Sequence, residues 1–255
     1  MRIQRALARA GVASRRRAEE LVAAGRVSIN GVVAQTGQSV DPQHDKITVD
    51  GKAVALPAAP EWIVLNKPTG VLTTRSDPGG RRTVFDMVED VPGLTYVGRH
   101  YMTEGVLLLT TDGDAAHKLT HPSSEVERTY VATVRGDGAD AARAAMKGVE
   151  LEDGLVMPTS VSARRVGRGI WDVELTIAEG KTREIRRLCE ALSLEVLRLV
   201  RTKFGPVKLG TLESGKTRAL TARETEIIAA LTKGGGKTKN TTGGARRERN
   251  HRNSR

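Results

Sequence analysis

Histidine is the residue type whose spacing first suggests chemistry in this chain. His117 and His121 are four residues apart, as two metal ligands on one helical face can be, but no third ligand accompanies them. Ser123 and Ser124 lack the Gly-x-Ser-x-Gly turn that exposes a hydrolase nucleophile. The sequence also has neither a Walker loop nor a dinucleotide fingerprint. It therefore predicts no metal site and no nucleotide cofactor.

Arginine and lysine are concentrated in three stretches. The chain has 255 residues and a net charge of +11. Residues 1–30 carry +5, residues 181–218 carry +6 and residues 233–255 carry +7, so the remainder carries −7. Basic patches on an acidic body favour a polyanionic partner, nucleic acid before membrane. Because residues 1–61 contain no aromatic side chain, contact with the phosphates of folded RNA is favoured there over base stacking.

Two short helices and a hairpin are predicted at the N-terminus. Apolar residues at helical spacing predict a helix over residues 3–10, and Ser14 can cap a second over residues 15–24. A strand over residues 26–29 follows, with the hairpin signal Asn30-Gly31 at its end, and a second strand covers residues 46–49. Residues 1–54 are therefore predicted to form a helix-helix-hairpin domain, joined by a linker at residues 55–60.

The remaining residues predict a larger α+β domain with a mainly antiparallel sheet. Helices are expected at residues 139–147, 183–192 and 221–231, the last opened by a capping box at Thr221 and Glu224. Strands are expected over residues 62–65, 106–109, 130–134, 155–164 and 170–178. This domain is assigned to residues 61–232, and the Gly-rich basic tail at residues 233–255 is predicted to be disordered.

Cellular location is predicted from the N-terminus and from cysteine content. The first residues are charged and amphipathic rather than an apolar signal core, and no apolar run is long enough to span a bilayer. The single cysteine, Cys189, allows no intramolecular disulfide. A cytoplasmic protein is expected.

Several short motifs, taken in order, resemble one family. Ser14-Arg15-Arg16-Arg17-Ala18-Glu19 and Gly25-Arg26-Val27-x-x-Asn30-Gly31 are similar to the S4 RNA-binding module. The turn Asn66-Lys67-Pro68-x-Gly70 is similar to the first motif of rRNA pseudouridine synthases of the RsuA type. Further matches follow at residues 103–113, at Glu127-Arg128-Thr129-Tyr130, at residues 179–188, and at Leu197-x-Leu199-Val200-Arg201 with Gly205-Pro206. Because these motifs occur in order over residues 1–232, the chain is identified as a member of that family.

One loop departs from the family's pattern. The family has G-R-L-D-x-x-T-E-G, which contains its catalytic aspartate. This chain has Gly98-Arg99-His100-Tyr101-Met102-Thr103-Glu104-Gly105, one residue shorter and without aspartate. Counted back from Gly105, His100 takes the aspartate's place, whereas counted forward from Arg99, Tyr101 does. Loss of three bases from a Leu-Asp codon pair would account for the change.

The resemblance implies the fold, the partner and the site. It implies an S4 domain followed by a pseudouridine synthase domain with a mainly antiparallel mixed sheet and flanking helices, acting as a monomer on ribosomal RNA without cofactor, metal or membrane. The implied catalytic residues are His100 in the slot of the missing aspartate, Tyr130 and Arg186. Implied substrate-binding residues are Asn66, Lys67, Pro68, Gly70, Arg99, Arg183 and Arg187. Implied RNA-binding residues are Arg2, Arg5, Arg15, Arg16, Arg17, Arg26 and Asn30.

Two functions follow from the altered loop. The first is an rRNA pseudouridine synthase that is inactive or impaired, because His100 offers no anion to Arg186. The second is a catalytically silent protein that binds structured RNA, such as a ribosome assembly factor. Glu104 is expected to be structural because the family has a glutamate there too, and Asp112 and Asp114 are expected to be turn or cap residues.

Overall fold

The N-terminal part of the chain folds as two helices against a small sheet. In the computed structural model, which describes residues 1–56, 59–100 and 102–233, α1 (Ile3–Arg9) and α2 (Arg15–Ala23) pack on a four-stranded antiparallel sheet. Ser14 caps α2 as predicted, since its Oγ accepts a hydrogen bond from the backbone N–H of Arg17 at 3.3 Å. The strand order is β2-β1-β3-β4, with β1 (Val27–Ile29), β2 (Val32–Val33), β3 (Ile47–Val49) and β4 (Lys52–Ala53).

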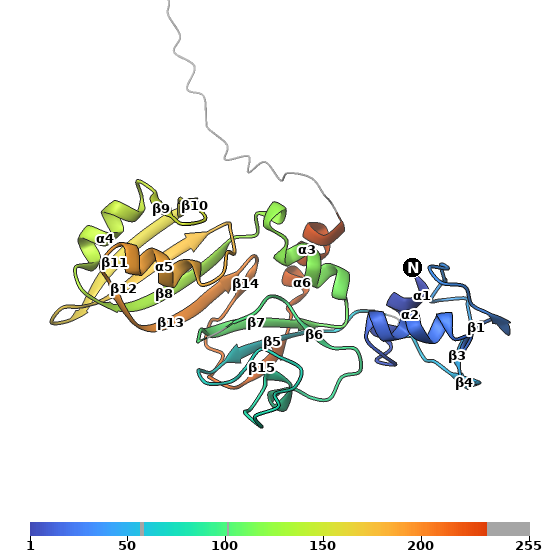
Figure 1. The fold of residues 1–255 in the computed structure, drawn as a ribbon. Helices are drawn as coiled ribbons and strands as arrows, with labels where there is room; N and C mark the ends of the chain where they lie inside the picture. The colour runs from blue at the N-terminus through green and yellow to red at the C-terminus, as the bar shows by residue number, and fades with distance from the viewer. Residues whose placement is uncertain (57–58, 101, 234–255) are drawn as a thin grey trace, which may run out of the picture.

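A nine-stranded mixed sheet organises the larger part of the chain (Figure 1). Its main order is β11-β12-β8-β13-β7-β5-β15, with β6 paired to β7 and β14 paired to β13. The nine strands are β5 (Trp62–Lys67), β6 (Thr95–Tyr96), β7 (Glu104–Thr110), β8 (Arg128–Arg135), β11 (Ser160–Gly167), β12 (Ile170–Ile177), β13 (Glu195–Phe204), β14 (Val207–Lys208) and β15 (Thr217–Ala219). Within this sheet β7 and β13 pair parallel and the other described pairs are antiparallel. The predicted α+β class is confirmed.

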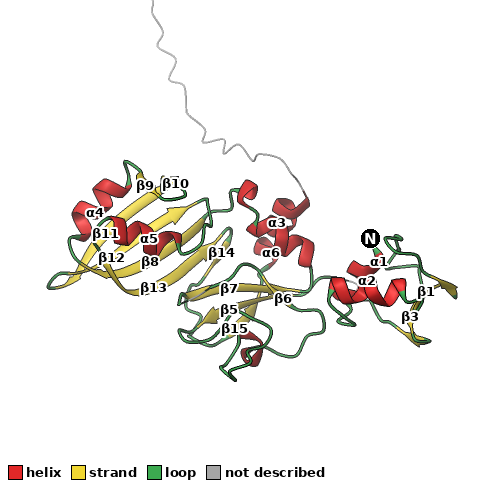
Figure 2. Cartoon of the chain, in the orientation of Figure 1, coloured by secondary structure: helices red, strands yellow, loops and turns green. Residues whose placement is uncertain are grey.

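Helices cover two separate parts of this sheet (Figure 2). The helices α4 (Gly138–Ala145) and α5 (Glu184–Ala191) share one core with β8, β12 and β13, beside the hairpin of β9 (Val149–Leu151) and β10 (Gly154–Val156). A second core joins α3 (Gly113–Thr120) and α6 (Ala222–Lys233) to β5, β7 and the end of β13. Two short 3₁₀ turns lie at Val84–Met87 and Pro122–Ser124. No helix within the described ranges is long and apolar enough to cross a membrane.

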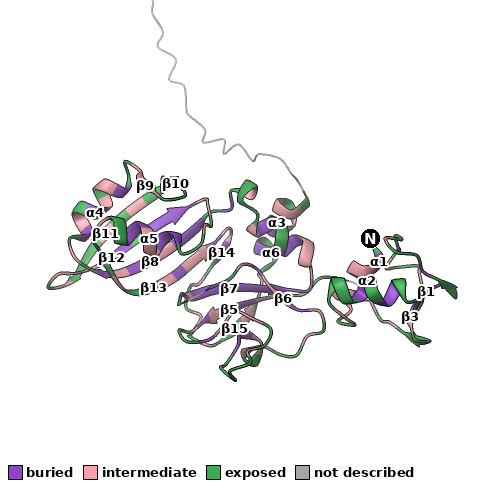
Figure 3. Ribbon diagram, viewed as in Figure 1, coloured by how far each residue is buried: buried purple, intermediate pink, exposed green. Residues whose placement is uncertain are grey.

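The two halves of the sheet meet where β7 runs parallel to β13. A Cβ atom added to Gly105 would lie 2.2 Å from the backbone oxygen of Arg201, and Gly105 has a φ of 93°. Only glycine combines this approach with this conformation. Glycine in the Thr103-Glu104-Gly105 motif therefore brings the loop before β7 against the strand that carries Arg201. At this junction β7 is buried along nearly its whole length, whereas β13 is buried at Leu199, Arg201 and Phe204 (Figure 3).

Two sequence predictions of local structure need correction, and one long strand was missed. The strand predicted over residues 155–164 is two strands, β10 and β11, because Pro158 has no N–H for a continuous ladder. Asn66 and Lys67 belong to β5 rather than to the turn, which follows at Pro68–Gly70. The long strand β13 was not predicted. Residues 234–255 of the predicted tail and residues 57–58 of the predicted linker lie outside the described residues.

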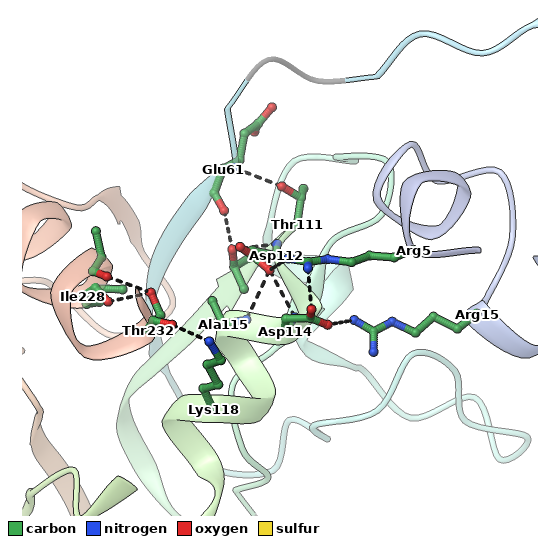
Figure 4. Close-up of polar contacts among 12 residues, drawn as sticks. Arg5, Arg15, Glu61, Thr111, Asp112, Asp114, Ala115, Lys118, Ile228 and Thr232 are labelled. Atoms are coloured by element: carbon green, nitrogen blue, oxygen red, sulfur yellow. Dashed lines mark hydrogen bonds and ion pairs between the residues drawn. The ribbon is translucent and has the colours of Figure 1, made fainter. Parts of the chain in front are cut away.

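Ion pairs join the N-terminal part to the larger part (Figure 4). Arg5 contacts Asp112 at 3.1 Å and Asp114 at 2.5 Å, and Arg15 also pairs with Asp114. Asp112 caps α3 by accepting hydrogen bonds from the backbone N–H groups of Asp114 and Ala115, both at 3.1 Å, which confirms its predicted role. Asp114 lies in the first turn of α3 and faces the arginines of the N-terminal helices.

Candidate active site and RNA-binding surface

The loop between β6 and β7 buries His100. The backbone N–H of His100 donates to Thr73 Oγ1 at 3.3 Å, and Thr73 Oγ1 donates to the His100 carbonyl at 3.1 Å. These contacts hold the loop against the turn that follows β5, and His100 is only 6% exposed. The histidine predicted to stand in the aspartate's place is therefore an interior group rather than a surface one.

His100 is neutral at physiological pH. Burial lowers the pKa of its imidazole well below the ordinary value, and the positive charges of Arg201, Lys67 and Arg128 lower it further. Neither ring nitrogen has a hydrogen-bond partner among the described residues. The imidazole can accept or donate a hydrogen bond, but it supplies no negative charge.

Two buried cations lie behind this histidine. Arg201 Nε donates to the Val106 carbonyl at 2.8 Å, and its guanidinium carbon lies 4.7 Å from the centre of the Phe204 ring. Burial lowers the pKa of Arg201 to about 10, against the opposing effect of Tyr130. Lys67 is fully buried, and its Nζ donates to the Pro68 carbonyl at 2.9 Å and the Thr103 carbonyl at 3.3 Å. Burial lowers the pKa of Lys67 to about 8.

The opposite wall belongs to α5 and the turn before it. Arg186 Nη2 donates to the Met102 carbonyl at 2.6 Å, so it reaches the same loop as His100. Glu184 Oε2 accepts a hydrogen bond from the Lys181 N–H at 3.1 Å, and burial raises the pKa of this carboxyl. Arg183 and Met102 adopt left-handed φ values of 53° and 54° at the two edges. Such conformations are uncommon outside glycine and cluster at functional sites.

These walls enclose a cavity of about 420 Å³, within the range of ligand pockets. Of the predicted catalytic and substrate residues, the cavity brings together His100, Tyr130, Arg186, Arg99 and Arg183. Four further charged residues line it that were not among the predicted site residues, namely Arg128, Lys181, Glu184 and Arg201. All four lie inside the motifs that carried the resemblance. Their neighbours in the sequence did not distinguish them from charged residues on a solvent-exposed surface.

Five predicted substrate residues lie outside the lining of this cavity. Asn66 Nδ2 donates to the Leu212 carbonyl at 2.7 Å and thus fixes a loop. Arg187 pairs with both Asp153 oxygens, at 2.8 and 2.7 Å. Pro68 and Gly70 form the turn after β5, and Lys67 joins this turn to the loop before β7 through the Pro68 and Thr103 carbonyls. Glu104 pairs with Arg198 at 2.8 Å, as its expected structural role requires.

The predicted RNA-binding residues lie around the N-terminal helices and hairpin, and most already have partners. Arg2 donates to the Gly37 carbonyl, Arg17 pairs with Glu20 at 2.5 Å, and Arg26 pairs with both oxygens of Asp50. Asn30 donates to Asp45 at 2.8 Å. Arg5 and Arg15 bind the acidic start of α3 as described above. Arg16 is exposed and has no ion pair within the described part of the chain.

A second cavity lies between the two parts of the molecule. It has a volume of about 710 Å³, and its lining includes the arginines Arg5, Arg9, Arg15, Arg75 and Arg99. Gly98, Arg99 and Thr120 line both this cavity and the one that contains His100. The cavity between the two parts of the molecule, called the junction groove below, is therefore adjacent to the cavity around His100. His117 also lines the groove, and its ring centre lies 5.7 Å from that of His121, but the described residues hold no cluster of three or more metal-ligand side chains.

Comparisons with known proteins agree with this architecture. The family model described as RNA pseudouridylate synthase matches residues 61–191, and the S4 domain model matches residues 1–45. An uncharacterized RNA pseudouridine synthase of Mycobacterium tuberculosis is 42% identical over 231 residues, which are 88% of this chain and 91% of that protein. Ribosomal large subunit pseudouridine synthase B of Bacillus subtilis is 39% identical over 236 residues, 90% of this chain and 96% of its own. A crystal structure of a pseudouridylate synthase superposes with a TM-score of 0.59 at 27% identity, covering 91% of this chain and 99% of that one.

The fold, the cavity and these matches define an S4 domain followed by a pseudouridine synthase domain. The chain belongs to the RNA pseudouridine synthase family. The resemblance inferred from the ordered motifs is confirmed.

Proposed function

We propose that this chain binds a uridine of ribosomal RNA in the cavity around His100 and isomerises it, if at all, at a severely reduced rate. The observation that carries the proposal is His100 itself, a buried and neutral imidazole where the family has a carboxylate. The division at residues 1–54, 55–60 and 61–232, a cytoplasmic location and a monomeric state are parts of the same proposal.

The chemistry of the family explains why the carboxylate matters. The reaction breaks the N-glycosidic bond of a uridine, turns the uracil and joins its C5 to the ribose C1′. The base must first leave its stack. A carboxylate acts at the sugar, either as a nucleophile or as the group that removes a sugar proton. Neutral His100 can take a proton but offers no anion, whereas Tyr130 remains available to stack on the uracil and Arg186 to orient the loop.

The direct test is restoration of the carboxylate. Replacing His100 by Leu-Asp gives the loop its family length and charge. Loss of a catalytic nucleophile commonly costs on the order of 10⁴–10⁶ in rate. We therefore expect single-turnover pseudouridine formation on ribosomal RNA to be at least about 10⁴-fold faster in the Leu-Asp variant. Product is measured by chemical mapping of the modified RNA.

A matched control is replacement of His100 by Leu-Asn, which restores the loop length without the charge. It should stay as slow as the natural chain. Equal rates in the natural chain and in the Leu-Asp variant would overturn the proposed impairment. Both variants should bind the RNA as the natural chain does, so loss of binding would indicate a folding defect instead.

Ribosomal RNA is proposed as the substrate on two grounds. The relative from Bacillus subtilis is named a ribosomal large subunit pseudouridine synthase. The arginine-lined groove between the S4 domain and the synthase domain adjoins the deeper cavity through Gly98, Arg99 and Thr120. Folded RNA held in the groove would thus present a flipped uridine to the cavity without leaving the basic surface.

A second candidate function is structured-RNA binding without catalysis, as in a ribosome assembly factor. It is favoured by the S4 arginines and the junction groove, which do not depend on the missing carboxylate. The two functions separate in a strain that lacks the chain. If the assembly role holds, the natural chain and the Leu-Asn variant restore ribosomal subunit profiles equally well while neither forms pseudouridine. If the enzyme role holds, restoration follows pseudouridine formation.

A further inference from the structure

The cavity around His100 holds more positive charge than its described lining neutralises. Six basic side chains line it, namely Arg99, Arg128, Lys181, Arg183, Arg186 and Arg201, whereas Glu184 is its one acidic residue among those described. Arg201 is the most enclosed of the six, at 3% exposure. An arginine guanidinium stays protonated in proteins, so it cannot lose its positive charge by giving up a proton. The described lining of the cavity therefore carries an excess of positive charge.

Five buried polar atoms of the residues that line this cavity have no hydrogen-bond partner in the described structure, namely Nδ1 and Nε2 of His100, Nη2 of Arg201, Nε of Arg186 and Oε1 of Glu184. Three of the five belong to His100 and Arg201. A buried donor without a partner is costly, and interior polar groups in folded proteins are nearly always satisfied. One nitrogen of the neutral imidazole carries a proton, so His100 supplies one N–H, and the charge of Arg201 acts on the same ring.

The nearby carboxylates do not fill this position. Glu184 Oε2 accepts from the Lys181 N–H at 3.1 Å, whereas its Oε1 has no hydrogen-bond partner in the described structure. The charges that act on this carboxyl are those of Glu179, Lys181 and Arg128 rather than that of Arg201. Glu104 is held by Arg198 at 2.8 Å on the other side of the loop. Arg128 donates hydrogen bonds to backbone carbonyls, and its Nη1 lies 2.6 Å from the backbone oxygen of Glu179. Arg201 thus has no carboxylate partner among the described residues, and the side chain that favours its charged form is Tyr130.

We propose that the floor of this cavity is a binding site for a small free carboxylate, of which formate is the simplest. One oxygen accepts from Nη2 of Arg201 and the other from the N–H of His100. Directed pairs of this kind between guanidinium and carboxylate are short and strong. A chloride ion brings the charge but not two separate acceptor atoms. The site is a property of the free protein and holds whether or not the chain modifies RNA.

The experiment is thermal unfolding of the full chain in sodium formate and in sodium chloride at equal ionic strength. The best very small ligands gain about 1.5 kcal/mol per non-hydrogen atom, so formate should bind no more tightly than about 0.5 mM. At roughly ten times its dissociation constant, formate should raise Tm by about 3–5 °C above the chloride value. The rise should saturate, and ¹³C-formate should show line broadening that unlabelled acetate reverses.

Two variants of His100 with side chains of equal size test whether formate binds at this position. H100D supplies the carboxylate from within and should abolish both the formate-specific rise and the line broadening. H100N offers an amide N–H without charge and should keep them. As a surface control, R223K should behave as the natural chain does, since Arg223 is exposed on α6.

Three results would overturn the proposal. One is a formate effect no larger than that of chloride, and the second is an unchanged formate effect in H100D. The third is loss of the effect in H100N while that variant remains folded by circular dichroism. Because the NMR measurement does not depend on the stability of the variant, it decides the matter even if Tm itself moves.

Discussion

The arginines of the S4 domain and those of the cavity around His100 have opposite surroundings. Arg26 lies on the surface with both oxygens of Asp50 beside it, and this hydrogen bonding raises its pKa. Arg201 lies in the interior against a carbonyl and an aromatic ring, and burial lowers its pKa to about 10. A surface arginine can exchange its carboxylate for a phosphate at little cost. An interior arginine keeps its position only because the backbone around it is fixed.

The largest expected effect tests that fixed backbone. In G105A the added Cβ would overlap the Arg201 carbonyl at 2.2 Å, at a φ of 93° that alanine disfavours. We expect a loss of about 3 kcal/mol or more in the free energy of unfolding, measured with urea. The matched change in the S4 domain is G51A, at a φ of 76° with no atom within 4 Å of the added Cβ. It should cost about 1 kcal/mol. Similar losses in the two variants would remove the distinction between the two regions.

The second effect concerns the buried lysine that donates to the loop before β7. Burial lowers the pKa of Lys67 from 10.5 to about 8. Between these values the unfolded chain binds more protons than the folded chain, so the free energy of unfolding rises with pH across that window. The contribution of Lys67 is about 3 kcal/mol. In K67M that part of the rise should vanish, whereas K52M, on the exposed strand β4, should retain it. An identical pH profile in K67M would show that Lys67 is not buried as a cation.

The third and smallest effect concerns RNA binding by the S4 domain. Simultaneous replacement of Arg15, Arg16 and Arg17 by alanine should weaken binding to ribosomal RNA. The salt slope of binding should flatten by about 0.7–0.9 for each phosphate that the variant no longer neutralises. Since Arg15 and Arg17 already have acidic partners, the single variant R16A should account for one full phosphate. Filter binding between low and moderate salt measures the slopes. An unchanged slope would count against this face of the S4 domain.

Local features of this fold were predictable because their causes are local. The Ser14 cap and the reciprocal capping of Thr221 and Glu224 both depend on residues three apart, and both are present. The parallel pairing of β13 with β7 joins residues almost a hundred positions apart, and no periodicity encodes it. The same limit applies to the site. His100, Tyr130 and Arg186 were selected through ordered motifs, whereas the burial of Arg128 and Arg201 arises only when distant strands meet.

Partners of the S4 arginines were unpredictable for a similar reason. Arg5 and Arg15 meet the start of α3 about a hundred residues away in sequence. Arg5 and Arg15 cannot be distinguished by residue type or local charge from Arg16, which is exposed. Charge counts therefore indicate how many cations a surface can offer, and only the folded chain shows how many are unengaged.

Arg99 lies at the boundary between two cavities. Together with Gly98 and Thr120, it lines both the groove at the domain junction and the cavity around His100. A change at this residue therefore alters the lining of both cavities at once. In the proposed function, Arg99 would contact the RNA backbone and, with Gly98 and Thr120, would set the distance between the held phosphate and the extruded base.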